Sequence, residues 1–373
     1  MPKKYPIKRY IKIAVAVFII FTGILSAHLT FLYTDFQKNN QAPLNIKTFD
    51  GSNSPYHPAV IYFEQSWNGY KYWMAETPYS PDCKPYRDRN ECPSLHVSND
   101  GINWTEITQN PIDNLDTKGI SELDYFSDPH LVFVNNHLEC WYRLTKRYGE
   151  ESNRSDVYLL RKTSKNGVDW SKREVLARLK HDIDNGLGCM VVSPAIIFEK
   201  GEYQMWYVDS ELNKRNIAFS TSIDGYEWNN KIICELQGKE ISPWHIDIKF
   251  INKRYLLTCY DFECITMYES YDKINFKYIT TILSPSVPGS YYGNSLYRAS
   301  LIHDGKYKLY FSSDDIFNTY IGVMEGEEIT SMQVKDINSS KHRNFIEFTC
   351  YKMKIYYRRY CFICKNLFKR LSE

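Results

Sequence analysis

The sequence predicts an all-β protein, a five-bladed β-propeller with an N-terminal transmembrane helix and a basic, helical C-terminal tail. Three observations support this prediction. A strand–turn–strand pattern occurs five times between residues 50 and 325, and a second type of turn alternates with it. Aromatic residues make up 16% of the chain, with 31 tyrosines. Such a composition favours strands over helices.

The N-terminal region predicts a membrane anchor. Residues 1–12 carry five cations and no acid, and residues 13–34 form an uncharged, apolar run. That run is long enough to cross a bilayer as a helix, and the cations before it should stay inside. We therefore expect a cytoplasmic N-terminus at 1–12, a signal-anchor at 13–34 and an extracytoplasmic body. The alternative is a cleaved signal peptide, although cleavage after Ala27 would place Leu25 where a small residue is preferred.

Five repeats fill the body of the chain, which we place at residues 51–330. Each has a short apolar strand, a turn rich in Asn, Asp, Lys and Gly, and an aromatic-rich strand, which indicates a β-hairpin. The segments are HPAVIYFEQSWNGYKYWMAE from His57, DPHLVFVNNHLECWYRLT from Asp128, SPAIIFEKGEYQMWYVDS from Ser193, HIDIKFINKRYLLTCYDF from His245 and RASLIHDGKYKLYFSSDD from Arg298.

A second turn follows each of the first four hairpins. It reads SNDGINW from Ser98, SKNGVDW from Ser164, SIDGYEW from Ser222 and SYDKINF from Ser270. Each unit therefore supplies four strands, and four-stranded units at this spacing are typical of propeller blades. A β-sandwich would not account for five copies of one pattern. The fifth unit lacks the second turn, so we expect the strand LNIKTF from Leu44, within a linker or closing strand at 35–50, to complete it.

The charge is distributed unevenly. Residues 341–373 carry nine Lys or Arg and two Glu, so the tail and the N-terminus are basic and the middle of the chain is acidic. An acidic body argues against nucleic acid as a partner. In the tail, at 331–373, apolar residues from Met353 to Leu371 recur at helical spacing among the cations. This pattern predicts an amphipathic basic helix that either lies on a membrane surface or packs on the propeller.

Propeller topology places the starts of all five first strands at one mouth of the ring. Polar residues occupy these starts above apolar strand interiors, which is typical of a binding face. The ends of the second strands and the loops after them reach the same mouth. The residues that we expect to bind substrate there are His57, Arg143, Ser193, Asp209, His245, Asp247 and Arg298.

The order of the units, the Asp128-Pro129 and Ser193-Pro194 strand starts and the SxDGxxW turns resemble a known group. It is the five-bladed β-propeller superfamily of arabinanases, levansucrases and invertases, and the nearest likeness is to the family 43 and family 32 glycoside hydrolases. The resemblance implies carbohydrate as the partner. It also implies an acidic residue at the start of each of the first three blades, where this chain has His57, Asp128 and Ser193.

Glycoside hydrolysis requires a pair of carboxylates. Asp128 matches the family position, and Glu91 in NECPSL resembles the Glu-Cys-Pro of invertase-like enzymes. We therefore predict Asp128 and Glu91 as the catalytic residues of a hydrolase or transglycosidase acting on extracytoplasmic glycans. The alternatives are a sugar-binding propeller without catalysis and a protein-interaction platform. No cofactor is predicted, because His245 and Asp247, which could hold a central metal ion, are only two ligands.

Overall fold

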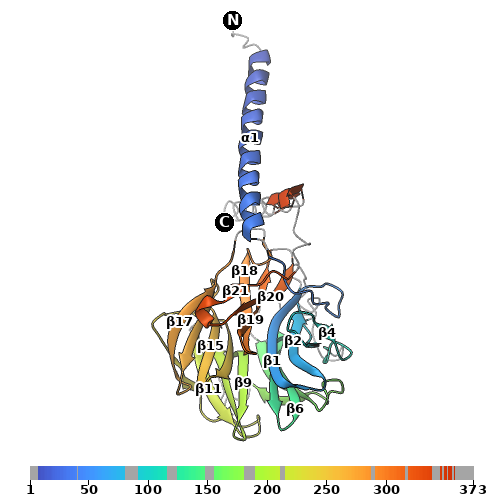
Figure 1. The fold of residues 1–373 in the computed structure, drawn as a ribbon, viewed down its shortest axis with the longest axis vertical. Helices are drawn as coiled ribbons and strands as arrows, with labels where there is room; N and C mark the ends of the chain where they lie inside the picture. Colours follow the sequence, from blue (N-terminus) through green and yellow to red (C-terminus); the bar gives the residue numbers. More distant parts are fainter. Residues whose placement is uncertain are drawn as a thin grey trace.

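The protein, described here from a computed structural model, is a ring of β-sheets below one long helix (Figure 1). The structure describes residues 7–39, 41–79, 91–115, 124–147, 155–179, 190–210, 215–286, 290–315 and 318–337, and single residues between 345 and 357. Its five sheets follow one another along the chain, and each is one blade. The predicted five-bladed propeller is confirmed.

The first three blades each contain four antiparallel strands in chain order. The first blade contains β1 (Pro55–Trp67), β2 (Tyr70–Pro78), β3 (Ser94–Ser98) and β4 (Thr105–Glu106). The second contains β5 (Tyr125–Val134), β6 (His137–Arg147), β7 (Ser155–Ser164) and β8 (Glu174–Arg178). The third contains β9 (Val191–Glu199), β10 (Glu202–Asp209), β11 (Asn216–Ser222) and β12 (Ile232–Ile233).

The fourth blade has an additional strand at its outer edge. It contains β14 (His245–Ile251), β15 (Arg254–Tyr260), β16 (Ile265–Ser270) and β17 (Asn275–Leu283), and β13 (Glu235–Gln237) runs parallel to β17. The fifth contains β18 (Ser295–His303), β19 (Tyr307–Asp314), β20 (Thr319–Gly326) and β21 (Gln333–Val334), with a 3₁₀ turn at Ile329–Ser331.

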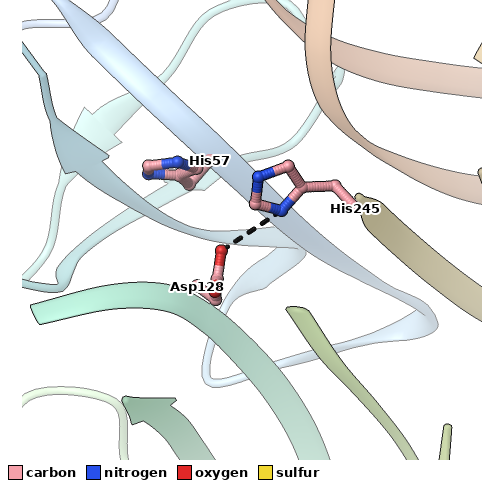
Figure 2. A group of neighbouring side chains, drawn as sticks. All are labelled: His57, Asp128 and His245. Atoms are coloured by element: carbon pink, nitrogen blue, oxygen red, sulfur yellow. Dashed lines mark ion pairs between the residues drawn. The ribbon is translucent and has the colours of Figure 1, made fainter. Parts of the chain in front are cut away.

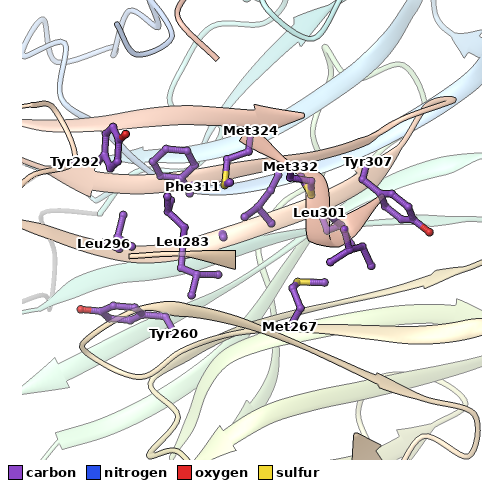
Figure 3. Close-up of a cluster of buried hydrophobic side chains, with 14 of the residues drawn as sticks. Tyr260, Met267, Leu283, Tyr292, Leu296, Leu301, Tyr307, Phe311, Met324 and Met332 are labelled. Carbon is purple, nitrogen blue, oxygen red and sulfur yellow. The ribbon is translucent and has the colours of Figure 1, made fainter. Parts of the chain in front are cut away.

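The first strands of the blades surround the axis. Each contacts the first strand of the next blade, and β18 contacts β1, so the ring is closed. Apolar clusters fill the space between neighbouring blades. Figure 3 shows the cluster between the fourth and fifth blades, where Met267 and Tyr260 face Leu301 and Phe311. Burial of these aromatic and aliphatic side chains stabilises the ring.

The repeated SxDGxxW turns join neighbouring blades. A Cβ added to Gly167, in the turn of the second blade, would lie 2.1 Å from the ring of Trp73 in the first. Gly225 of the third blade is related in the same way to Trp141 of the second. In the fourth blade Lys273 replaces glycine with φ of 77°, and its carbonyl accepts the Nε1 hydrogen of Trp206 at 2.9 Å.

The same contact closes the ring. Tyr310 of the last blade donates its hydroxyl hydrogen to the carbonyl of Gly101 in the turn of the first, at 3.0 Å. In the second strand of the fourth blade, Thr258 occupies the position that Trp206 and Tyr310 have in their blades. The next blade, the fifth, has no SxDGxxW turn for an aromatic side chain to contact. The aromatic residue is thus present where the following blade has the turn.

The prediction that the segment from Leu44 supplies the fourth strand of the fifth blade is wrong. The fourth strand of the fifth blade is β21, which pairs with β20. Residues 44–49 form no strand. The Leu44 N–H donates to the carbonyl of Ile321 at 2.9 Å, and Leu44 and Ile46 are buried among residues of the first and fifth blades. This segment therefore covers the junction at which the ring closes. It is displaced from the strand position because β21 already occupies that edge.

Helix α1 (Ile7–Asn39) carries the long apolar run. The stretch Lys12–Thr34 has the length and composition of a membrane span, and nearly all of it is exposed. At the foot of α1 the ring of Tyr33 lies 5.2 Å from that of Phe345 and 5.4 Å from that of Phe348, measured between centroids. The described residues near Phe348 are helical, and most of the helix predicted from Met353 to Leu371 lies outside the described residues.

Candidate functional site

Strained strand starts position three of the predicted site residues. His57, Asp128 and Ser193 each precede a proline and have φ of 53°, 53° and 52°. The register of each first strand shifts there, as at a β-bulge. Positive φ is rare outside glycine, and bulges often re-aim a side chain at a site. We attribute the repeated bulge to the positioning of these residues around the axis.

Three side chains from three blades meet near the axis. His57 of β1, Asp128 of β5 and His245 of β14 are buried, and one ligand atom of each lies within 4.8 Å of the others (Figure 2). His245 Nδ1 lies 3.3 Å from Asp128 Oδ1. A tetrahedral metal ion holds its ligand atoms about 3–3.5 Å apart, so the His245–Asp128 separation matches that of a metal site, while the set of three is up to 4.8 Å wide.

Asp128 is held by its other oxygen. Oδ2 lies 2.9 Å from Nε of Arg143 and accepts the backbone N–H of Ser193 at 3.2 Å. Burial opposes the ionisation of Asp128, but the nearby Arg143 and His245 outweigh it. They hold the pKa of Asp128 well below its usual range. The carboxylate is therefore charged and fixed in direction at neutral pH.

The atoms that face one another in the cluster lack hydrogen-bond partners. Asp128 Oδ1 and both ring nitrogens of His245 are buried and make no hydrogen bond within the described part of the chain. The 3.3 Å approach of His245 Nδ1 to Asp128 Oδ1 is an ion-pair distance without hydrogen-bond alignment. Buried polar atoms are normally satisfied. This cluster therefore has the donor atoms and the unsatisfied valences that a bound cation would use.

His57 is oriented by a neighbouring hydroxyl. Its Nδ1 lies 2.7 Å from Thr77 Oγ1, which leaves Nε2 as the nitrogen able to bind a ligand. Its backbone N–H donates to Ser312 Oγ at 2.9 Å. Burial lowers the pKa of His57 well below its usual value and also lowers that of His245. Neutral imidazoles are the form that binds metals.

Arg298 lies beneath the cluster and contacts backbone. Its guanidinium is buried and donates to the carbonyls of Pro129 and Pro194 at 2.7 and 3.4 Å. These prolines follow Asp128 and Ser193, so Arg298 joins two of the strained strand starts. The sequence predicted a substrate-binding role for Arg298, and the structure places its described hydrogen bonds on the protein itself.

Two further predicted residues lie away from the cluster. Asp247 Oδ2 accepts the backbone N–H of Leu301 at 3.1 Å and lies 3.3 Å from Nζ of Lys249. Asp209, at the end of β10, lies 2.6 Å from Nζ of Lys231. The ligand atoms that the structure brings together with His245 are those of His57 and Asp128.

Glu91 is buried at the same mouth. The pKa of Tyr297 is raised by burial and further by the carboxylates of Asp128 and Glu91. The pKa of Tyr125 is also raised by burial, and the same two carboxylates raise it further. Glu91 and Asp128 therefore border the same region of the mouth.

Tyr297 and Tyr56, which the sequence analysis did not single out, form one side of the site. Tyr297 lies 4.1 Å from the ring of His245 and stacks on Tyr56, which in turn stacks on Tyr79. Tyr297 directly precedes Arg298, and Tyr56 directly precedes His57. Their positions next to two strand starts were the available signal, but aromatic residues are so frequent in this chain that the signal is weak.

The fold and the site geometry define a class of protein. The chain is a five-bladed propeller, as the resemblance in its sequence implied. No family model matches it. Among solved structures, an N-acetylgalactosamine deacetylase from F. plautii matches over 77% of this chain and 95% of that one, with a TM-score of 0.61 and 19% identity. A xylan β-1,4-xylosidase from Bacillus halodurans covers 82% and 58%, with a TM-score of 0.55 and 14% identity.

Two curated proteins are similar in sequence. An A type blood N-acetyl-α-D-galactosamine deacetylase from Flavonifractor plautii is 22% identical, over 69% of this chain and 40% of that protein. The uncharacterized protein MT1551 from Mycobacterium tuberculosis is 24% identical, over 41% of this chain and 48% of that protein. The chain thus spans less than half the length of either curated relative. The likeness to the solved structures named here shows the shared fold.

Proposed function

We propose that this protein is a metal-dependent hydrolase that removes the acetyl group from N-acetylated amino sugars in extracytoplasmic glycans. The observation that carries the proposal is the cluster of His57, Asp128 and His245, with its unsatisfied buried atoms. The Flavonifractor plautii relative, which has the same fold, is a deacetylase, and this supports the choice of an amide as the bond that is broken. The reaction adds water across that amide and releases acetate and a free amine.

His57 Nε2, Asp128 Oδ1 and a nitrogen of His245 would hold a divalent ion such as Zn²⁺, which favours this combination of ligands and keeps a position open for catalysis. When bound, such an ion supplies an acidic water and polarises a carbonyl oxygen. Thr77 and Arg143 orient two of the ligands, as outer-shell partners commonly do.

The other mouth residues have separate tasks in this proposal. Tyr297 and Tyr56 provide apolar faces for a sugar ring and exclude water from one side of the site. Glu91 is the candidate for proton transfer to the leaving amine, because it borders the same region as Asp128. Arg298 holds the strand starts and does not act on substrate.

The experiment uses the full chain in detergent micelles. We expect metal analysis to find about one divalent ion per chain and expect acetate release from N-acetylhexosamine glycans. A chelator should abolish that release and added Zn²⁺ should restore it. Asp128→Asn and His245→Ala should each reduce turnover by about 10²-fold or more. A folded protein that binds no metal and releases no acetate from any N-acetylated glycan would overturn the proposal.

A glycoside hydrolase with a pair of catalytic carboxylates is the second candidate. Besides burial, the charges of Glu91 and Asp128 both raise the pKa values of Tyr125 and Tyr297, so the two carboxylates border one region. It predicts new reducing ends in place of acetate, and activity that survives the chelator. Glu91→Gln should then abolish the release of reducing sugar. Glycan binding without either product would instead indicate a sugar-binding propeller without catalysis.

We also propose that α1 anchors the protein in a membrane, with residues 1–12 in the cytoplasm and the propeller outside. The apolar stretch Lys12–Thr34 and the five preceding cations support this orientation. The basic tail at 341–373 would then lie at the membrane surface, close to the foot of α1, where Phe345 and Phe348 meet Tyr33.

A further inference from the structure

A row of aromatic rings leads from the cluster to the surface between the third and fourth blades. Tyr297 contacts His245 and accepts the Nε1 hydrogen of Trp244 at 3.0 Å. The ring of Trp244 lies 5.4 Å from that of Phe262, whose side chain is 48% exposed. A glycan chain that has one sugar at the cluster could therefore continue outward along these rings.

Arg215 lies at the outer end of this row. Its Cζ is 4.7 Å from the ring centroids of both Trp244 and Phe262. Arg215 directly precedes β11, and Asn216 pairs with Asp209 at the end of β10. That end of β10 also pairs with the start of β9, so Arg215 is on the same mouth as the cluster.

Two other stacked arginines in this protein have acidic partners. Arg161 lies over Trp141 and pairs with Glu174 at 2.7 Å, and Arg173 lies over Phe126 and pairs with Asp113 at 2.6 Å. Arg215 has the aromatic contacts, but within the described ranges no carboxylate lies within ion-pair distance of it. Its guanidinium is held in a fixed plane by the two rings, while its N–H groups lack an anion.

A pocket adjoins Arg215. It has a volume of about 380 Å³, and Asn216, Glu240 and Ser242 are among its lining residues together with Arg215 itself. This volume is within the range of small-ligand sites, about 300–1,000 Å³. Pro243 also lines it and adjoins Trp244, so the pocket lies beside the aromatic row.

We propose that this pocket binds an anionic sugar neighbouring the sugar that reacts at the cluster, and that Arg215 determines this specificity. The substrates are therefore acidic glycans with a carboxylate or phosphate group. A guanidinium forms two parallel hydrogen bonds to such an oxyanion, and stacking on aromatic rings preserves the required geometry. The choice of substrate class depends on the deacetylase function proposed above, whereas the binding of an acidic glycan does not.

The test compares matched oligosaccharides in which the N-acetylhexosamine is linked to glucuronic acid, to a phosphorylated hexose or to neutral glucose. The wild-type full chain should have the higher kcat/KM on at least one acidic substrate, and the two acidic arms distinguish carboxylate from phosphate. Arg215→Met should lower kcat/KM on the preferred acidic substrate by about 10–100-fold and leave the neutral one within about 2-fold. Arg178→Met is the matched control, since Arg178 stacks on Tyr158 at 5.2 Å elsewhere.

Equal losses on acidic and neutral substrates, or no preference for acid in the wild type, would overturn the proposal. If no substrate is deacetylated, direct binding of the same three oligosaccharides decides the matter separately. Tighter binding of an acidic glycan that Arg215→Met removes would support the subsite while the deacetylase function fails. Binding that is indifferent to charge would overturn the subsite as well.

Discussion

Arg298 donates through Nη1 to the carbonyl of Pro129 at 2.7 Å, and this hydrogen bond links the last blade to the strained strand start that carries Asp128. Burial lowers the pKa of Arg298, and the negative charges of Asp128 and Asp247 oppose this lowering. Arg298 thus compensates the buried negative charge and fixes the backbone next to Asp128. The two functions make Arg298 a structural element of the site.

Arg298→Met should destabilise the propeller by about 3–5 kcal/mol, because it removes a buried positive charge near the carboxylates of Asp128 and Asp247 and leaves two backbone carbonyls without their donor. Chemical denaturation of the full chain measures the change. Lys306→Met is the control, since Lys306 is exposed and pairs with the exposed Glu327, and it should leave the stability of the propeller essentially unchanged. Equal stability of the two variants would contradict the role assigned to Arg298.

Gly167→Ala should destabilise the contact between the first two blades by about 2–5 kcal/mol. The added Cβ would lie 2.1 Å from Trp73, and φ at this residue is +77°, so steric overlap adds to backbone strain. In the control Gly201→Ala, φ is +82° and no atom lies within 4 Å, so only the strain of about 1–2 kcal/mol remains. Thermal unfolding should rank the two variants in this order, and the reverse order would refute the blade contact.

The repeats explain why the fold could be predicted from the sequence. Hairpin turns and strand starts recur at comparable places in each unit, and a propeller is built from such units, so local signals added up to a global prediction. The last strand could not be predicted, because β21 is only two residues long and Gln333–Val334 has no pattern of its own. The segment from Leu44 is apolar enough for a strand, yet it packs at the junction of the first and fifth blades.

The site was only partly accessible from the sequence. Strand-start position placed His57, Asp128 and His245 at one mouth, and the structure brings these three together. Their use as a ligand set could not be recognised, because the residues come from three blades and have no local spacing. Thr77 had no signal at all, since it is one of many threonines and acts through a contact that only the folded ring creates.

Acid should weaken the SxDGxxW turns. Burial opposes the ionisation of Asp100, but hydrogen bonds from Asn103 and Ile102 outweigh it and lower its pKa to about 2. Turn hydrogen bonds also lower the pKa of Asp224 and of Asp272. A lowered pKa in the folded state adds stability above the unfolded pKa of about 3.9, and this stability is lost as the pH falls through the folded pKa.

A variant with all three aspartates changed to asparagine tests this dependence. Asparagine should keep the turns, since Asn166 accepts the same backbone hydrogen bonds in the second blade. At pH 7 we expect the variant to be less stable by about 1–2 kcal/mol, after allowance for solvent screening of these exposed groups. The difference should shrink between about pH 4 and pH 2. Denaturation at several pH values measures it, and a constant difference would argue against the assigned pKa values.

Protease added to intact cells should degrade the propeller, because five cations precede the apolar stretch Lys12–Thr34 and should keep the N-terminus inside. Tags placed before residue 7 and on the propeller report the two sides separately. The N-terminal tag should survive until the cells are lysed. A propeller that is protected in intact cells and degraded only after lysis would reverse the proposed orientation.

Thr77→Val should weaken metal binding while leaving the propeller folded. Thr77 Oγ1 lies 2.7 Å from His57 Nδ1, and loss of such an outer partner typically lowers metal affinity by about 10–100-fold. Valine keeps the shape of threonine, so the ring beneath should pack as before.

Thr258→Val is the matched control, because Thr258 is equally buried and its hydroxyl contacts Met267 Sδ at 3.2 Å, away from the cluster. Competition of Zn²⁺ against a chromophoric chelator measures both affinities, and the control should match the wild type. If the two variants lose affinity equally, the effect is a general loss of stability. Thr77 would then have no specific part in orienting His57.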